Sequence, residues 1–99
     1  MSQPTVRVIA TLRAKPGREG ALRSLAAGLL APTRIEAGCI RYELLENEAD
    51  PAELTFVEEW RSADALQAHL ATEHVQHARS RWPDLLAAEL DLRRYKLVG

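Results

Sequence analysis

Alternating apolar and polar side chains predict four β-strands in this chain. A period of two is typical of a strand whose two faces meet different surroundings. In the first such run, Val6, Val8, Ala10 and Leu12 alternate with residues that are polar except for Ile9. The alternation recurs three more times, and the predicted strands cover residues 6–13, 39–46, 54–60 and 90–98.

The segment after the first strand has helical spacing. From Leu22 to Leu30 the apolar residues recur at intervals of three and four, which predicts an amphipathic helix. Because proline lacks the N–H that a helix interior needs, we expect this helix to kink or restart at Pro32 and to end at Gly38. Residues 47–51 contain Asn, Asp and Pro, and this composition predicts a turn.

Two further helices are predicted after the third strand. Ser62 and Thr72 are good N-cap residues, because a hydroxyl oxygen can accept a hydrogen bond from the first helical turn. The first of these helices places His69 on the same side as its leucines. The second should end or bend at Pro83.

The order strand, helix, strand, strand, helices, strand predicts an α+β fold of the ferredoxin-like split βαβ type. We expect a single domain, residues 1–99, in which helices cover one face of a four-stranded antiparallel sheet. Ile9, Leu45, Val57 and Leu97 lie on the opposite face of their strands, so the open face is partly apolar. Since an exposed apolar surface is commonly an interaction site, we expect a homodimer that packs sheet against sheet.

Charge and segment lengths limit the class of partner. The net charge is −1 over 99 residues, with no concentrated cationic surface of the kind that nucleic acid binding needs. No apolar run approaches the roughly 20 residues of a membrane span, and the first residues lack the pattern of a secretory signal. The only cysteine, Cys39, agrees with a reducing compartment and is interpreted as a packed residue. We therefore expect a cytoplasmic protein.

Residues 56–74 contain the side chains best suited to catalysis or ligand binding. Glu58 and Trp60 share one face of the third strand, and His69 and His74 follow on the next two helices. A carboxylate, an indole and two imidazoles could therefore share one pocket. An imidazole can act as a general base near neutral pH, but a buried histidine is also commonly a structural residue. Glu58 could equally form an ion pair with an arginine, and Trp60 could be part of the core.

The sequence has no metal or cofactor motif that we recognise. No His-Glu-x-x-His sequence is present, and among the histidines only His74 and His77 occupy neighbouring helical positions. A Gly-rich phosphate loop, a Cys pair and a Gly-x-Ser-x-Gly elbow are also absent. We therefore expect neither a metal ion nor an organic cofactor.

Short motifs in the same order and spacing as those of a known family extend over almost the whole chain. They are Ala-Lys-Pro-Gly at residues 14–17, the run at residues 33–43, Glu58-x-Trp60, His69-Leu70 and Thr72-x-His74. Together they closely resemble the antibiotic biosynthesis monooxygenase (ABM) domain family, and they most resemble its quinol monooxygenase branch.

This resemblance implies a dimeric ferredoxin-like enzyme that oxidises a phenol or hydroquinone with O2, without metal, flavin or haem. A small aromatic substrate would supply the electrons, because its deprotonated form can pass an electron to O2 before the two radicals combine. The resemblance further implies His69 as base or proton shuttle and Glu58 as its hydrogen-bonding partner. It implies Trp60 and Tyr42 as aromatic walls of the pocket, and His74 as a second polar contact.

Other functions remain open at this point. Some relatives rearrange small metabolites without O2, and an isomerase of that type needs the same acid and base. A dimer that only binds a metabolite is a further alternative. A haem-degrading branch uses an Asn, a Trp and a His, whereas the corresponding positions here hold Ala10, His69 and Arg79, so haem breakdown is not expected.

Overall fold

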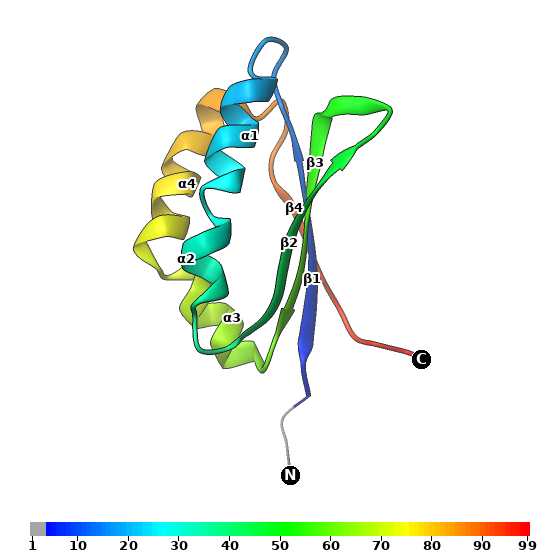
Figure 1. Cartoon of the computed structure of the whole chain (residues 1–99), viewed down its shortest axis with the longest axis vertical. Helices are drawn as coiled ribbons and strands as arrows, with labels where there is room; N and C mark the ends of the chain where they lie inside the picture. Colours follow the sequence, from blue (N-terminus) through cyan, green and yellow to red (C-terminus); the bar gives the residue numbers. More distant parts are fainter. Residues whose placement is uncertain (1–3) are drawn as a thin grey trace.

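Four strands form one antiparallel sheet in the computed structural model, which describes residues 4–99 (Figure 1). They are β1 (Val6–Arg13), β2 (Cys39–Asn47), β3 (Asp50–Trp60) and β4 (Asp91–Tyr95). Their order across the sheet is β2-β3-β1-β4, so the first and third strands are central. This order confirms the α+β, ferredoxin-like arrangement that the sequence predicts.

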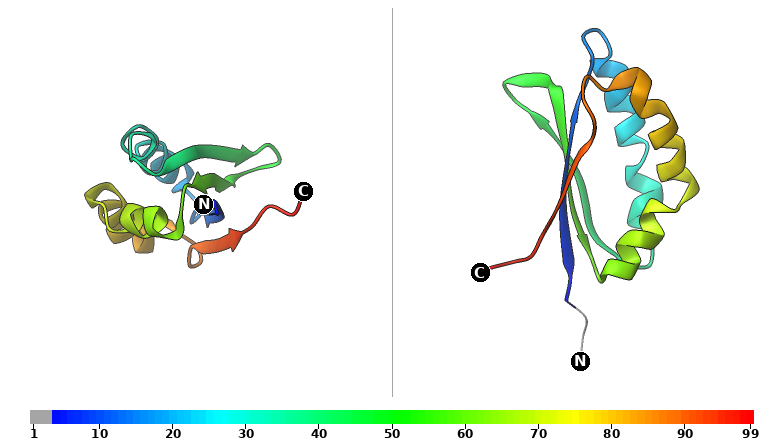
Figure 2. Two further views of the ribbon diagram at one scale, coloured as in Figure 1. Left: turned by 90° about the horizontal axis from the view of Figure 1, so that it is seen from below. Right: turned by 180° about the vertical axis from the view of Figure 1, so that it is seen from behind.

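The helices cover one face of the sheet, and the other face is open (Figure 2). They are α1 (Glu19–Ala27), α2 (Leu30–Arg34), α3 (Ala63–Leu70) and α4 (Glu73–Leu85). Alternate side chains of the strands pack against the apolar sides of the helices and form the core. Its most deeply buried members include Val8, Leu12, Leu22, Leu54 and Leu66.

The first helical segment breaks earlier than predicted. α1 ends at Ala27 and α2 begins at Leu30, so Pro32 lies inside the first turn of α2. Proline has no N–H to offer the carbonyl four residues earlier, and its ring collides with that carbonyl in a continuous helix. The affected carbonyl is that of Gly28, which explains why the interruption falls at residues 28–29. Similarly, α4 continues past Pro83 and ends at Leu85.

The turn between β2 and β3 is tighter than the predicted turn at residues 47–51. Asn47 pairs with Asp50, so Pro51 already lies within β3. The side chain of Asn47 accepts a hydrogen bond from the backbone N of Ala49 at 2.8 Å, and this local bond stabilises the short turn.

The start of β2 differs from simple alternation at Ile40. The strand register shifts there, because Cys39 pairs with Trp60 while Arg41 pairs with Glu59. An extra residue of this kind disrupts the period of two. Alternation along the predicted strand 39–46 would place Ile40 on the same face as the buried Tyr42, but Ile40 is 43% exposed, so this expectation is wrong.

The open face of the sheet is partly apolar, as predicted. Ile9 pairs with Val57 in the centre of the sheet, on the face away from the helices, and Leu45 is exposed on β2. Leu97 lies beyond the end of β4 at Tyr95, so the predicted strand 90–98 is too long and Leu97 is not part of the sheet.

No helix within residues 4–99 combines the length and the apolar character that crossing a bilayer requires. The expectations about a secretory leader and about a domain that begins at residue 1 depend partly on Met1–Gln3, which lie outside the described residues.

Candidate active site

The register of the sheet places three site residues on the face that the helices cover. Glu58 of β3 pairs with Val8 on one side and with Tyr42 on the other. Phe56 lies on the same face, two residues before Glu58, and its ring stacks on Tyr42 with a centroid separation of 4.9 Å. An acid and two aromatic rings therefore form a continuous surface beneath the helices.

The junction between α3 and α4 positions two histidines. Ser62 caps α3 and Thr72 caps α4, as predicted, and each side chain accepts a hydrogen bond from the first turn of its helix. Thr72 Oγ1 also donates to the carbonyl oxygen of His69 at 2.7 Å, which ties the end of α3 to the start of α4. His69 and His74, on either side of this junction, have ring centroids 6.1 Å apart.

Glu36 links the two imidazoles. Its Oε2 atom lies 2.8 Å from Nδ1 of His69 and 2.8 Å from Nε2 of His74. Because an ionised carboxylate can only accept hydrogen bonds, each imidazole donates from the nitrogen that faces Glu36. The carboxylate thus fixes the orientation of both rings.

His69 has the protonation state of a general base. The residue is 3% exposed, and its burial lowers its pKa below the usual value, although Glu36 acts in the opposite direction. The ring is therefore neutral near pH 7, with its proton on Nδ1 and a lone pair on Nε2. Among residues 4–99 no hydrogen bond involves Nε2, and His69 is one of the residues that line a cavity.

A close backbone approach brings Glu36 to the site. Glu36 belongs to the loop between α2 and β2, in which a Cβ on Gly38 would collide with the Cβ of Ala65 on α3. The carbonyl oxygen of Gly38 also accepts a hydrogen bond from the backbone N of Arg61 at 2.9 Å. Glycine at this position therefore lets the loop lie against α3, where Glu36 reaches His69.

Glu58 is a buried acid without a cationic partner among the described residues. It is 5% exposed, and its Oε1 atom accepts a hydrogen bond from Nε1 of Trp60 at 2.9 Å. Burial raises the pKa of Glu58 to about 7, with a smaller increase from Glu36, while the bond from Trp60 acts in the opposite direction. A large share of the Glu58 side chains therefore keep their proton at neutral pH. The nearby Arg7 pairs with Glu59 instead, at 3.6 Å.

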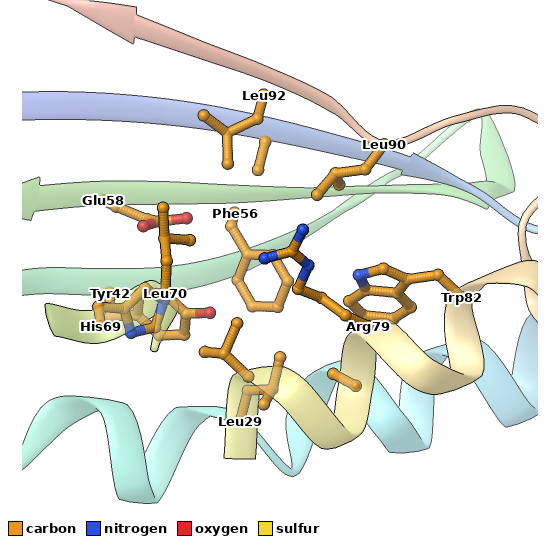
Figure 3. Close-up of a pocket in the computed structure, with 13 residues that line it drawn as sticks. Leu29, Tyr42, Phe56, Glu58, His69, Leu70, Arg79, Trp82, Leu90 and Leu92 are labelled. Atoms are coloured by element: carbon orange, nitrogen blue, oxygen red, sulfur yellow. The ribbon is translucent and has the colours of Figure 1, made fainter. Parts of the chain in front are cut away.

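A cavity of about 380 Å³ opens between the sheet and the helices (Figure 3). This volume lies in the range of small-molecule sites. Figure 3 shows Glu58, Tyr42 and His69 at one end and Trp82 at the other, with Arg79 between them. The remaining walls are apolar and include Leu29, Leu70, Val75, Leu90 and Leu92.

Two of the five predicted site residues do not line this cavity. Trp60 is fully buried and packs behind His69, with ring centroids 4.4 Å apart. His74 contacts Glu36 and lies outside the cavity lining. Both residues are therefore placed to support the groups that a ligand would meet, whereas the sequence analysis expected them to contact it.

Sequence reasoning missed Glu36 and Arg79. The hydrogen bond to His69 that we expected from Glu58 is made by Glu36, a residue of the motif at 33–43 to which the sequence pattern gives no role. Arg79 enters the sequence comparison only as a departure from the haem-degrading pattern, yet it lines the cavity. The available signal for Glu36 was a carboxylate two residues before Gly38, the glycine that directly precedes β2.

Glu36, His69 and His74 are also the residues that could hold a metal ion. One potential ligand atom from each lies within 4.8 Å of the others. A carboxylate with two imidazoles is a frequent donor set for divalent metals. A metal ion here would have to replace the protons that both imidazoles share with Glu36, so it would break the hydrogen-bonded arrangement described above.

The family model described as Antibiotic biosynthesis monooxygenase matches residues 5–81 of this chain. The chain belongs to this family. The match includes the loop that carries Glu36, strand β3 and both histidines of the junction between α3 and α4, so most of the site lies within the part of the ABM domain that is matched.

Individual ABM relatives agree in sequence and in fold. Rv0793 of Mycobacterium tuberculosis is 40% identical over 86 residues, which cover 87% of this chain and 83% of that protein, and its solved structure matches with a TM-score of 0.91. YcnE of Bacillus subtilis is 30% identical over 88 residues, covering 89% of this chain and 93% of that protein. Both are named provisionally as monooxygenases, and neither name gives a substrate.

The crystal structure of PA3566 from Pseudomonas aeruginosa has a TM-score of 0.94 with 30% identity, and the match covers 100% of this chain and 99% of that one. The Synechocystis protein sll1783 is 31% identical over 91 residues, which are 92% of this chain but 62% of that protein. The chain thus spans less than two thirds of the length of this relative, although it matches others nearly end to end.

Proposed function

We propose that this ABM protein is a cofactor-independent monooxygenase that oxidises a hydroquinone or a related phenolic aromatic compound with O2. The observation that carries the proposal is a buried His69 whose Nδ1 is held by Glu36 and which lines a cavity with aromatic walls. The family assignment supports monooxygenase chemistry at such a site.

His69 would begin the reaction as the base. Nε2 takes the proton of an aromatic hydroxyl group, and the imidazolium that forms is stabilised by the Glu36 carboxylate at 2.8 Å. His74 holds the same carboxylate oxygen and so prevents it from turning away from His69. The role that the sequence analysis gave to Glu58, orientation of the base, passes to Glu36.

The deprotonated substrate then supplies the electrons. It passes one electron to O2, and the resulting superoxide and substrate radical combine into a peroxide on a ring carbon. Loss of the hydrogen from that carbon, with cleavage of the O–O bond, leaves a carbonyl group and releases water. The balance is one hydroquinone and one O2 to one hydroxyquinone and one water.

Glu58 would serve as the acid in the last step. It keeps much of its proton near pH 7 and lies at the same end of the cavity as His69 (Figure 3). A neutral carboxylic acid can donate a proton to the departing oxygen, which a carboxylate cannot. Tyr42 and Phe56 form an aromatic surface next to it, against which a flat substrate can lie.

The same acid and base pair would also suit a cofactor-free isomerase, because proton removal by His69 and proton return by Glu58 need no O2. The two functions differ in oxygen consumption.

We also propose that two cytoplasmic copies associate through the open sheet face, on which Ile9, Val57 and Leu45 are grouped. Val57→Asp should then convert a dimer to a monomer in sedimentation experiments. Ser80→Asp adds the same charge at an exposed position of α4, on the helix side of the sheet, and should not.

The deciding experiment is oxygen uptake by metal-stripped protein with a panel of hydroquinones, corrected for autoxidation without protein. We expect protein-dependent uptake that His69→Gln reduces by about 10²-fold or more. His77→Gln is the matched control, because His77 is exposed on α4 and does not line the cavity. Uptake that is equal in the wild type and His69→Gln would contradict the role of the base. No uptake across the panel, with proton exchange into a bound phenolic ligand, would favour the isomerase.

A further inference from the structure

Arg79 brings a positive charge to the apolar cavity. It projects from α4, and Figure 3 shows its guanidinium group reaching toward the centre of the cavity. The side chains around it are largely apolar or aromatic, including Phe56, Leu70 and Trp82. Arg79 is exposed to solvent at the edge of the cavity, and a guanidinium without a protein partner can bind an anion that enters.

Within residues 4–99, Arg79 forms no ion pair, and its side chain is open to solvent. No hydrogen bond or ion pair joins it to a carboxylate, whereas Arg7, Arg13, Arg23 and Arg93 each pair with an acid. Glu58, the carboxyl group that lines the same cavity, bonds to Trp60 instead.

One further acid approaches Arg79 without pairing with it. Glu89 and Arg79 both line a neighbouring hollow, but they are not in ion-pair contact. The guanidinium is therefore the one cationic group of the described cavity lining, and its fork of N–H donors matches the geometry of a carboxylate.

We infer that Arg79 binds a carboxylate group of the substrate, which is therefore an aromatic hydroxy acid with its hydroxyl and acid groups at opposite ends. The inference rests on the proposed function in using the cavity as the substrate site. His69 and Glu58 meet the hydroxyl end, the ring system lies along Phe56 and the leucines, and Arg79 binds the acid nearer to Trp82. Arg79 would thus decide which phenols enter, without taking part in the proton transfer.

The test compares two probes of nearly the same shape, the anionic 6-hydroxy-2-naphthoate and the neutral 6-hydroxy-2-naphthamide, by calorimetry without turnover. The carboxylate should bind about 10-fold tighter or more, as expected for a charged hydrogen-bonded pair, and this preference should weaken with added salt. Arg79→Leu should remove the preference, and Arg79→Lys should retain part of it. Arg81→Leu removes the same charge from an exposed position of α4 and should leave the preference unchanged.

Equal affinities for the two probes in the wild type, or a preference that survives in Arg79→Leu, would overturn the inference. Failure of both probes to bind would overturn it as well, because the stated substrate class would not fit the cavity. His69→Gln should keep the carboxylate preference while losing oxygen uptake. The binding test of the anion site and the oxygen-uptake test of the proposed function can therefore give opposite results.

Discussion

Glu36 and His69 lie 33 residues apart in the chain, yet Oε2 of the first and Nδ1 of the second are 2.8 Å apart. This pair sets which nitrogen of His69 carries a proton. The carboxylate that holds Nδ1 leaves Nε2 as the nitrogen without a proton in the neutral ring.

Glu36→Gln should therefore impair the base more than the fold. The amide can still accept one hydrogen bond, but it cannot stabilise the imidazolium, so we expect the turnover rate to fall about 10²-fold or more. Because Glu36 raises the pKa of His69, the acidic limb of the pH profile should move to lower pH. The measurement is the pH dependence of oxygen uptake, with Glu43→Gln on the exposed face of β2 as control. A profile that keeps its acidic limb in Glu36→Gln would show that the pair is only structural.

Glu58→Gln should change how stability depends on pH. In the folded protein the pKa of Glu58 is raised from 4.5 to about 7, so the folded state binds more protons than the unfolded state between these values. The contribution of Glu58 to the unfolding free energy is thus present at low pH and is lost as the pH rises through about 7. Relative to Glu58→Gln, the wild type should lose about 3 kcal/mol between pH 4 and pH 8.

Urea unfolding at several pH values measures this difference. His69 acts in the opposite sense, because its lowered pKa costs stability below 6.5, but this effect is common to both proteins and cancels in the comparison. Parallel stability curves for the wild type and Glu58→Gln would mean that Glu58 titrates normally in the folded protein.

Gly38→Ala should destabilise the protein and weaken activity, because the new methyl group collides with Ala65 of α3 and displaces the loop that carries Glu36. Overpacking of this kind typically costs about 1 to 3 kcal/mol. The double variant Gly38→Ala with Ala65→Gly restores the space and should recover part of both losses, although glycine in a helix itself costs about 1 kcal/mol. A double-mutant cycle on the unfolding free energy measures this coupling. If the losses of stability in the two single variants simply add in the double variant, the collision between residues 38 and 65 is not the cause.

Treatment with a chelator should leave oxygen uptake unchanged, because the proposed base needs both imidazoles hydrogen-bonded to Glu36. Added Zn²⁺ should inhibit if it reaches this cluster, since it would replace the protons that His69 and His74 share with the carboxylate. The measurement is the rate of oxygen uptake with chelator, after dialysis, and again with Zn²⁺ titrated back. Activity that disappears with chelator and returns with a divalent metal would replace the cofactor-free proposal by a metal-dependent one.

The sequence was sufficient for the sheet, the helices and part of the site. Alternation predicted the strands because each has one buried face, and Ser62 and Thr72 marked helix starts because capping is a local interaction. Glu58 and His69 could be placed on inward faces for the same reason. The errors lie where two local rules compete. At Ile40 a register shift overrides the alternation of the strand, and at Gly28 the proline four residues later ends the first helix early.

The contact between Glu36 and His69 could not be predicted in this way. Glu36 lies in a loop without periodicity, and its partner is determined by how closely that loop packs on α3. For Arg79, the helical pattern does not show that a cavity opens beside this residue. Both features depend on tertiary packing, which the spacing of apolar residues in a single sequence does not reveal.

Glu58 accepts a hydrogen bond from Trp60, but its pKa is set mainly by burial, and it therefore depends on how much water the cavity holds. A ligand that fills the cavity removes water from around Glu58, and this raises its pKa further above the value of about 7. Binding of an uncharged ligand must then draw protons from the buffer, and its affinity must increase as the pH falls. The protein would thus be least protonated when empty, and an arriving molecule would bring about the proton uptake that the last chemical step consumes.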